Sequence, residues 1–239
     1  MENKNGQGVF LGVVGVATLV VAIIGATFAF FSAQTQSEAG AIQGNTLGGT
    51  DGGVLRLAVE KISWADAGAS SNDLVPTNIT TATAQAAVTA KCVATPGGTD
   101  TTKYTGCHLY RIVASAGSNV AQADLSLSSF TLDGVTDKTK WNYAVWSTSD
   151  AATASTYTLG TNVATATGTN EVTSSAAKTI FTGQAMTTEE SKVYYLLVYV
   201  ANENVSQNAD DSSNVTGSYT GQLTLSATGG SQVMATFSA

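Results

Sequence analysis

Histidine, cysteine and proline are scarce in this sequence, which has one histidine, two cysteines and two prolines among 239 residues. The single histidine, His108, excludes a zinc site built from a histidine pair. The sequence also lacks the nucleophile-elbow pattern and the glycine motifs that bind phosphate. We therefore expect no enzymatic activity and no small-molecule substrate. We expect His108 to lie at the surface or on an edge strand.

Charge is scarce as well. Charged residues form 11% of the chain, against about 25% in an average globular protein, and small polar residues fill the positions between apolar ones. Only ten residues are lysine or arginine, they are not clustered, and the formal net charge is −7. This distribution excludes the attraction by which proteins bind a phosphate backbone, so we expect no nucleic-acid partner. The composition is typical of a secreted or cell-surface protein.

The two cysteines, Cys92 and Cys107, flank a segment rich in Thr and Gly, as if at the two ends of a hairpin. We expect them to form a disulfide if the chain is exported to an oxidising compartment. A loop of this size would then stabilise the fold by about 3 kcal/mol. The alternative is two free thiols, one or both of them buried.

A long hydrophobic segment runs from Val9 to Phe31 without a charged residue. As a helix it would be about 35 Å long, which is enough to cross a bilayer. It is longer than the apolar region of an ordinary signal peptide, which has about 7 to 15 residues. The spacing of small residues places a signal cleavage region at Thr27, Ala29 and Phe30. The sequence therefore predicts a hydrophobic helix over 1–31 that contacts the membrane at least transiently and is either cleaved or retained.

Residues 32–53 are polar and Gly-rich, which indicates a flexible linker or a donor arm. Residues 54–239 show no helical periodicity. Instead, apolar residues alternate with polar ones, as in half-buried antiparallel strands. The run Val193–Val200 is apolar on both faces and is expected to be a central strand. We predict an all-β protein, an antiparallel β-sandwich or jelly roll over residues 54–239. The strands are expected at Val54–Ile62, His108–Ser115, Ala123–Leu132, Trp141–Ser147, Ile180–Phe181, Val193–Val200, Tyr219–Ala227 and Val233–Phe237.

The stretch from Ala151 to Ala177 is of low complexity, with only Tyr157, Leu159 and scattered valines to anchor it. It is expected to be a long exposed excursion, with a hairpin as one form that it could take.

A polar cluster follows the predicted central strand. Carboxylate and amide oxygens in a loop are the ligands that Ca²⁺ requires, although the spacing matches no calcium-loop template. The alternative is a hydrogen-bonded connection between two strands, with no bound cofactor. The residues in question are Asn202, Glu203, Asn208, Asp210 and Asp211.

Two stretches resemble a known family. The end of the hydrophobic segment, from Gly25 to Ser32, resembles the export signal of the TasA and camelysin group of bacterial surface proteins, which a dedicated signal peptidase processes. Tyr194 to Val200, the following Asn- and Gln-containing loop and the segment Gly217 to Gly221 resemble the strand, loop and return strand common in that group. The resemblance implies a jelly-roll domain that builds extracellular fibres by donating its N-terminal segment, here roughly Phe31 to Asn45, to a neighbour's sheet.

The sequence therefore predicts a structural subunit of a cell-surface fibre or matrix that associates with copies of itself. Some members of the family have been described as metalloproteases, an activity that a chain with one histidine does not inherit. One alternative is a type IV pilin-like subunit that keeps its N-terminal helix. Another is a membrane-anchored adhesion or binding module, which exposed tryptophans at Trp141 and Trp146 would favour.

Overall fold

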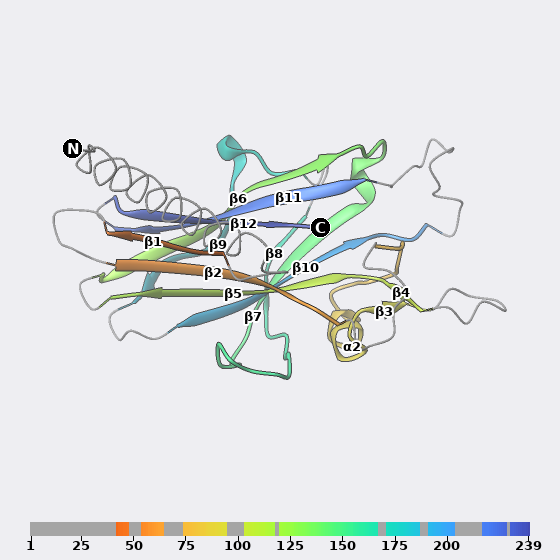
Figure 1. Ribbon diagram of the computed structural model, residues 1–239, viewed down its shortest axis with the longest axis horizontal. Coiled ribbons are helices and arrows are strands. Elements are labelled where there is room, and N and C mark those ends of the chain that lie inside the picture. The colour runs from red at the N-terminus through yellow and green to blue at the C-terminus, as the bar shows by residue number, and fades with distance from the viewer. Residues whose placement is uncertain are drawn as a thin grey trace, which may run out of the picture. The chain divides into compact units, whose positions relative to one another are not determined.

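The computed structural model describes residues 42–47, 54–64, 74–94, 103–117, 120–166, 171–186, 191–203, 217–228 and 230–239. Two antiparallel sheets of six and four strands enclose a hydrophobic core, and a small third sheet has two strands (Figure 1). The expected all-β antiparallel sandwich is confirmed. Within these ranges no helix is long and apolar enough to cross a membrane. The helix expected over 1–31, with Thr27, Ala29 and Phe30, lies outside the described residues.

The six-stranded sheet has the order β1-β2-β5-β10-β7-β8. β10 pairs with β5 on one side and with β7 on the other. Every residue of β10 from Val193 to Val200 is buried, which confirms the central strand expected from the sequence. The strands are β1 Ile42–Leu47, β2 Val54–Ile62, β5 His108–Ala116, β7 Trp141–Ser147, β8 Asn162–Thr165 and β10 Lys192–Val200.

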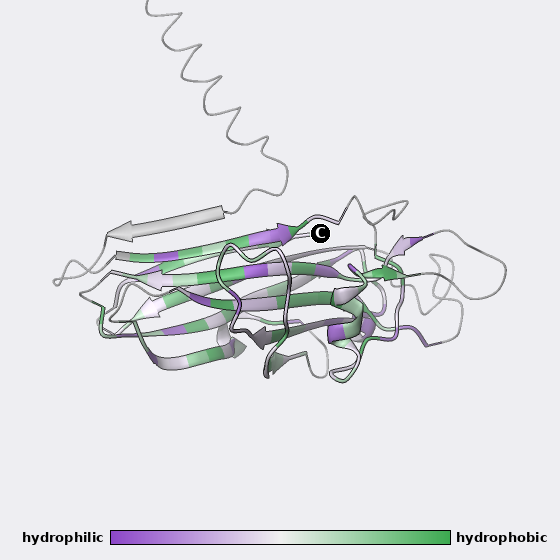
Figure 2. Cartoon of the chain, turned by 90° about the horizontal axis from the view of Figure 1, so that it is seen from below, coloured by the Kyte–Doolittle hydropathy of each residue, from purple (hydrophilic) through white to green (hydrophobic). Residues whose placement is uncertain are grey.

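The four-stranded sheet has the order β12-β11-β6-β9. β6 pairs with both β11 and β9, and bulges shift the register in each pairing. In β11 and β12 every second residue is buried in the core. Figure 2, which colours each residue by hydropathy, shows hydrophobic and hydrophilic residues interspersed along single strands. The strands are β6 Gln122–Asp133, β9 Lys178–Ala185, β11 Ser218–Ala227 and β12 Gln232–Ser238.

A second hydrophobic cluster covers the other face of the six-stranded sheet. It contains outward-facing residues of the sheet, such as Trp146, Tyr195 and Leu197, and residues of the segment 74–107. That segment carries a short helix, α2 (Ala84–Thr89), and the third sheet, formed by β3 (Val93–Ala94) and β4 (Tyr104–Thr105). β10 is therefore apolar on both faces because it lies between two cores. Two 3-10 turns, η2 (Lys138–Lys140) and η3 (Ser174–Ala176), complete the described elements.

Helix α2 corrects the expectation that helical structure is absent. It is only six residues long, and its N-cap residue, Thr83, makes no side-chain capping hydrogen bond. Ala84 and Val88, four residues apart, are its buried positions. Such a short helix gives almost no periodic signal, and its stability comes from packing against the sheet.

The beginning of the segment expected to be an exposed excursion docks on the same sheet. Tyr157 and Leu159 are half-buried against the second cluster, and the ring of Tyr157 meets that of Tyr195 edge-on at 5.7 Å. Arg111 donates to the carbonyl of Ala154 at 2.8 Å. β8 then pairs with β7, so a hairpin is present. The two anchors named from the sequence are confirmed, whereas full exposure was wrong for this part.

Candidate functional site

Strand β1 is an edge strand that pairs with β2 alone among the described strands. The antiparallel register runs from Ile42 opposite Val59 to Leu47 opposite Val54. β1 also lies beside β12 of the other sheet, so it closes one side of the sandwich (Figure 1). A strand in this place satisfies the backbone donors and acceptors of β2 that would otherwise face solvent.

The strand under β1 belongs firmly to the core. Leu55, Leu57 and Val59 of β2 are buried in the main cluster, whereas Arg56 between them is exposed. On its other side β2 pairs with β5 over its length. β2 is thus held in place by the core and by β5, and β1 pairs with its remaining edge.

From the sequence we expected residues 32–53 to form a flexible linker or a donor arm. In the structure a strand extends to Leu47 and pairs with its own chain. Within the expected arm, residues 42–45 belong to β1, and residues 31–41 lie outside the described part of the chain. In the sequence, four of the six residues between β1 and β2 are glycine.

The expected disulfide between Cys92 and Cys107 is present. Both cysteines are buried in the second cluster, and the bond joins the end of the α2 segment to the residue that precedes β5. The amide of Gly106 donates to the carbonyl of Cys92 at 2.7 Å. A β-carbon at Gly106 would lie 2.7 Å from the hydroxyl oxygen of Thr77, so this approach requires glycine. The disulfide therefore fastens the segment 74–107, here called the covering segment, to the six-stranded sheet.

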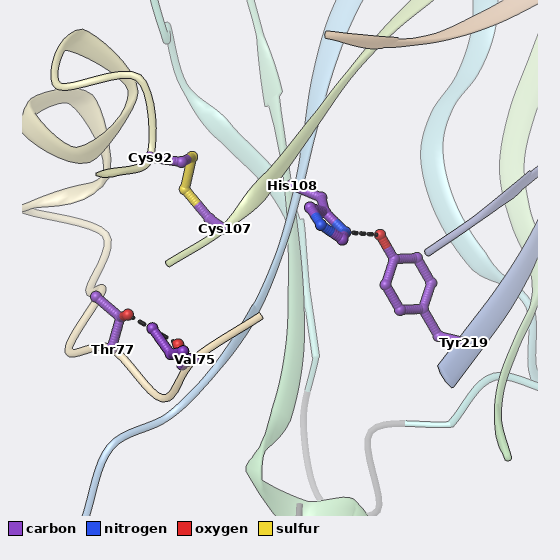
Figure 3. Close-up of a disulfide and its surroundings, with 6 residues drawn as sticks. All are labelled: Val75, Thr77, Cys92, Cys107, His108 and Tyr219. Atoms are coloured by element: carbon purple, nitrogen blue, oxygen red, sulfur yellow. Dashed lines mark hydrogen bonds between the residues drawn. A yellow bond between two sulfur atoms is a disulfide. The ribbon is translucent and has the colours of Figure 1, made fainter. Parts of the chain in front are cut away.

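His108 follows the disulfide directly but points to the opposite face of β5 (Figure 3). It is 4% exposed, and β5 lies between β2 and β10. The expectation of a surface or edge-strand histidine was therefore wrong. The reason is that the sequence does not show that Tyr219, on the other sheet, provides a polar partner inside the core. His108 Nδ1 lies 2.6 Å from the Tyr219 hydroxyl.

The polar groups around His108 form a chain of hydrogen bonds. The number of available protons determines which group donates in each bond. The Tyr110 hydroxyl donates to the backbone carbonyl of Ser238, so its oxygen is left to accept from the Tyr219 hydroxyl, 2.5 Å away. Tyr219 then has no proton left for His108, and His108 Nδ1 must donate to it. The chain fixes the Nδ1–H form of His108 and joins β5 of one sheet to β11 and β12 of the other.

Burial keeps the tyrosines of this core protonated. It raises the pKa of Tyr143 to about 12 and raises the pKa values of Tyr110 and Tyr219 further above their usual range. The hydrogen bond that Tyr219 donates to Tyr110 raises the pKa of Tyr219 and lowers that of Tyr110. Both effects agree with the assignment of Tyr219 as the donor and Tyr110 as the acceptor.

Removal of the middle hydroxyl should weaken the fold. Tyr219→Phe leaves His108 Nδ1–H without its acceptor and the Tyr110 oxygen without its donor, which costs about 1–3 kcal/mol for buried groups. Urea denaturation measures this loss. Tyr143→Phe, in the same core but outside the chain, is the control and should change stability by less than half as much. Equal losses in the two variants would contradict the assigned chain.

Lys61 lies on the inner side of β2, opposite Tyr110 in the register. Burial lowers its pKa from 10.5 to about 8 because the ammonium group loses contact with water. The charged form therefore destabilises the fold at about pH 8 and below, and this penalty disappears as the pH rises toward 10.5.

Replacing this lysine should stabilise the protein. We expect Lys61→Met to raise the free energy of unfolding at pH 7 and to remove a rise in stability between about pH 8 and pH 10. Because Lys61 is only half-buried, solvent screening reduces the gain expected from the pKa shift to roughly 2 kcal/mol. Denaturant titrations at pH 7 and pH 9.5 test both effects. Lys178→Met, on edge strand β9, is the control for loss of one positive charge. A variant that is less stable than the wild type at pH 7 would show that Lys61 is not penalised by burial.

The polar cluster considered for calcium is described only in part. The Glu203 carboxylate accepts from Lys140 Nζ at 2.5 Å, so a cation already balances its charge. Asn202 is half-buried beside it, and Asn208, Asp210 and Asp211 lie outside the described residues. Across the ranges that the structure describes, no group of three His, Cys, Asp or Glu side chains could hold a metal ion. The calcium site, three of whose five residues lie outside the described ranges, therefore stays a prediction.

Comparison with protein-family models, with curated proteins and with solved structures finds no match to this chain.

Proposed function

We propose that the chain is a secreted structural subunit of a cell-surface fibre or matrix, assembled by donor-strand exchange. The observation that carries this proposal is β1, a short strand on the edge of a sandwich whose other strands form the core. A short edge strand on a glycine-rich connection is the element that two copies of a chain can exchange at low cost. The resemblance of its N-terminal region to fibre-forming surface proteins agrees with this role.

The exchange conserves the contacts of β1. A subunit that gives its β1 to the β2 of a neighbour receives a β1 from the next subunit, and each β2 keeps the register seen within one chain. Main-chain hydrogen bonds provide affinity in this mode of recognition. Because giver and receiver use different surfaces, the contact is head-to-tail and builds an open filament.

Two further features support the proposal. The chain changes sheets at every connection from β5 to β11 except the β7–β8 hairpin, which is the alternation that we expect of a jelly roll. The disulfide suits an oxidising compartment outside the cytosol.

The adhesion alternative expected exposed tryptophans. Trp141 and Trp146 are each 3% exposed and belong to the two cores, so they offer no binding surface. The pilin-like alternative depends on the N-terminal helix, which lies outside the described residues. No described feature favours either alternative over the fibre.

N-terminal sequencing and intact mass of the protein from the cell surface, with and without boiling in detergent, test the proposal. A mature start near Phe30 in detergent-resistant multimers is the expected result. A start at Val9 would indicate the pilin-like filament. An intact Met1 in a membrane-bound monomer would exclude both filaments and favour an anchored binding module.

A further inference from the structure

The outer face of the four-stranded sheet consists of hydroxyl and amide side chains and carries almost no charge. On β11 and β12 polar residues alternate regularly with buried ones. Across β6, β11 and β12 only Asp124 and Asp133, near the two ends of β6, are charged. The outward residues between them are Ser126, Ser128, Thr131, Ser218, Thr220, Gln222, Thr224, Ser226, Gln232, Thr236 and Ser238.

An exposed sheet face without charged residues is unusual, because soluble proteins use charge on such faces to prevent association. One apolar side chain stands on this face, midway along its edge strand β12. Met234 is 48% exposed and is the one large hydrophobic residue exposed among the described residues. In the register Met234 lies opposite Thr224, which lies opposite Ser126. A methionine surrounded by small hydroxyl residues is a suitable anchor for a protein contact.

The charge of the molecule indicates which partner fits. A chain with a net charge of −7 repels copies of itself in general, and on β6, β11 and β12 only Asp124 and Asp133 add to that repulsion. These three strands carry no lysine or arginine, so they have no attraction for an acidic polymer. A second copy that presents the same face meets hydroxyl groups that both donate and accept, and two exposed Met234 side chains are covered together.

The size of the face determines when the contact forms. Three strands about 4.8 Å apart, with seven residues at about 3.4 Å each, cover roughly 340 Å², whereas a stable protein pair buries about 800 Å² per partner. Single molecules should therefore associate weakly, and a row of linked subunits should associate strongly because the contacts add. We infer that this face is the lateral contact between neighbouring filaments, formed with a second copy of the same chain. This inference rests on the proposed fibre.

Two lysines in the face test the contact. In Met234→Lys with Thr224→Lys, the lysines of one copy meet the lysines of the other copy in the contact. This repulsion should weaken association about tenfold or more. The control is Ser155→Lys with Thr156→Lys. Both residues are exposed, and both lie in the connection between β7 and β8 of the six-stranded sheet. Electron microscopy of filaments from the full chain should show bundles for the wild type and the control, and separate filaments of normal length for the face variant. Thr236→Lys, on edge strand β12, is a second variant that disturbs the fold less.

Bundles of face variants that equal those of the wild type would overturn the inference and leave the fibre intact. If the wild type forms no filaments, the fibre proposal fails, and sedimentation of the unassembled chain over a range of concentrations tests the face by itself. Weak self-association that the face variants lose and the control keeps would then support the contact. Sedimentation of the wild type that is independent of concentration would overturn it.

Discussion

Cysteines introduced at Asn45 and Arg56 are expected to join neighbouring subunits of an assembled fibre into covalent chains. The two residues lie directly opposite each other in the β1–β2 pairing. Opposed residues of an antiparallel pair have Cα atoms about 4.5–5.5 Å apart, which a disulfide can bridge. If β1 comes from a neighbour, oxidation links two molecules and the products form a ladder on a non-reducing gel. In the unassembled chain, where β1 pairs with its own β2, the same oxidation should give a closed monomer that no longer enters fibres.

A matched control uses the other neighbour of the same residue. Arg56 also lies opposite Ser115 of β5, and both strands belong to the folded body of one chain. Arg56→Cys with Ser115→Cys should therefore give a monomer in fibres and in solution alike. Fibres that remain fully monomeric on the gel after oxidation of the Asn45→Cys, Arg56→Cys variant would exclude the exchange of β1.

Loss of the native disulfide is expected to have the largest effect on stability. Cys92 and Cys107 are separated by 15 residues, and a loop of that length contributes about 3 kcal/mol. Replacing both cysteines by alanine should lower the melting temperature by about 6–12 °C, at about 2–4 °C for each kcal/mol in a chain of this size. Calorimetry measures the shift. The covering segment should become mobile first, because the bond fastens that segment and not the main core.

The reduced wild type provides the comparison for this variant. A reductant should bring the wild type to the stability of the double alanine variant and should not affect the variant itself. Amide exchange should increase over residues 74–94 more than over β10, which both cores protect. A variant with unchanged melting temperature would show that packing alone holds the covering segment in place.

Strands with a regular pattern could be predicted closely. The boundaries of β7 and of β2 agree with the structure to the residue, because β7 is rich in aromatic residues and β2 has leucine and valine at every second position from Leu55 to Val59. The central place of β10 followed from its two apolar faces. In each case a local pattern reflects the burial of a single strand, and such a pattern needs no knowledge of its neighbours.

Features that depend on contacts between distant residues could not be predicted. His108 and Tyr219 form one buried polar chain although they are 111 residues apart, and neither position shows by itself that the other is its partner. β1 is a strand of Gln, Gly, Asn and Thr between Ile42 and Leu47, and its extended form comes from pairing with β2 more than from its own composition. Helix α2 was not predicted because it is too short to show a helical period in the sequence. Its stability comes from packing against the sheet, which the sequence does not show.

The strand order also determines when the protein can fold. β10 separates β5 from β7, and β11 separates β6 from β12, so strands made early in synthesis have to wait for partners made near the end. Neither sheet is complete before most of the chain has emerged, and folds dominated by such distant pairings take milliseconds to seconds to form. We therefore expect the nascent polypeptide to stay unfolded for most of its synthesis, which is the state that the proposed secretion through a translocation channel would require.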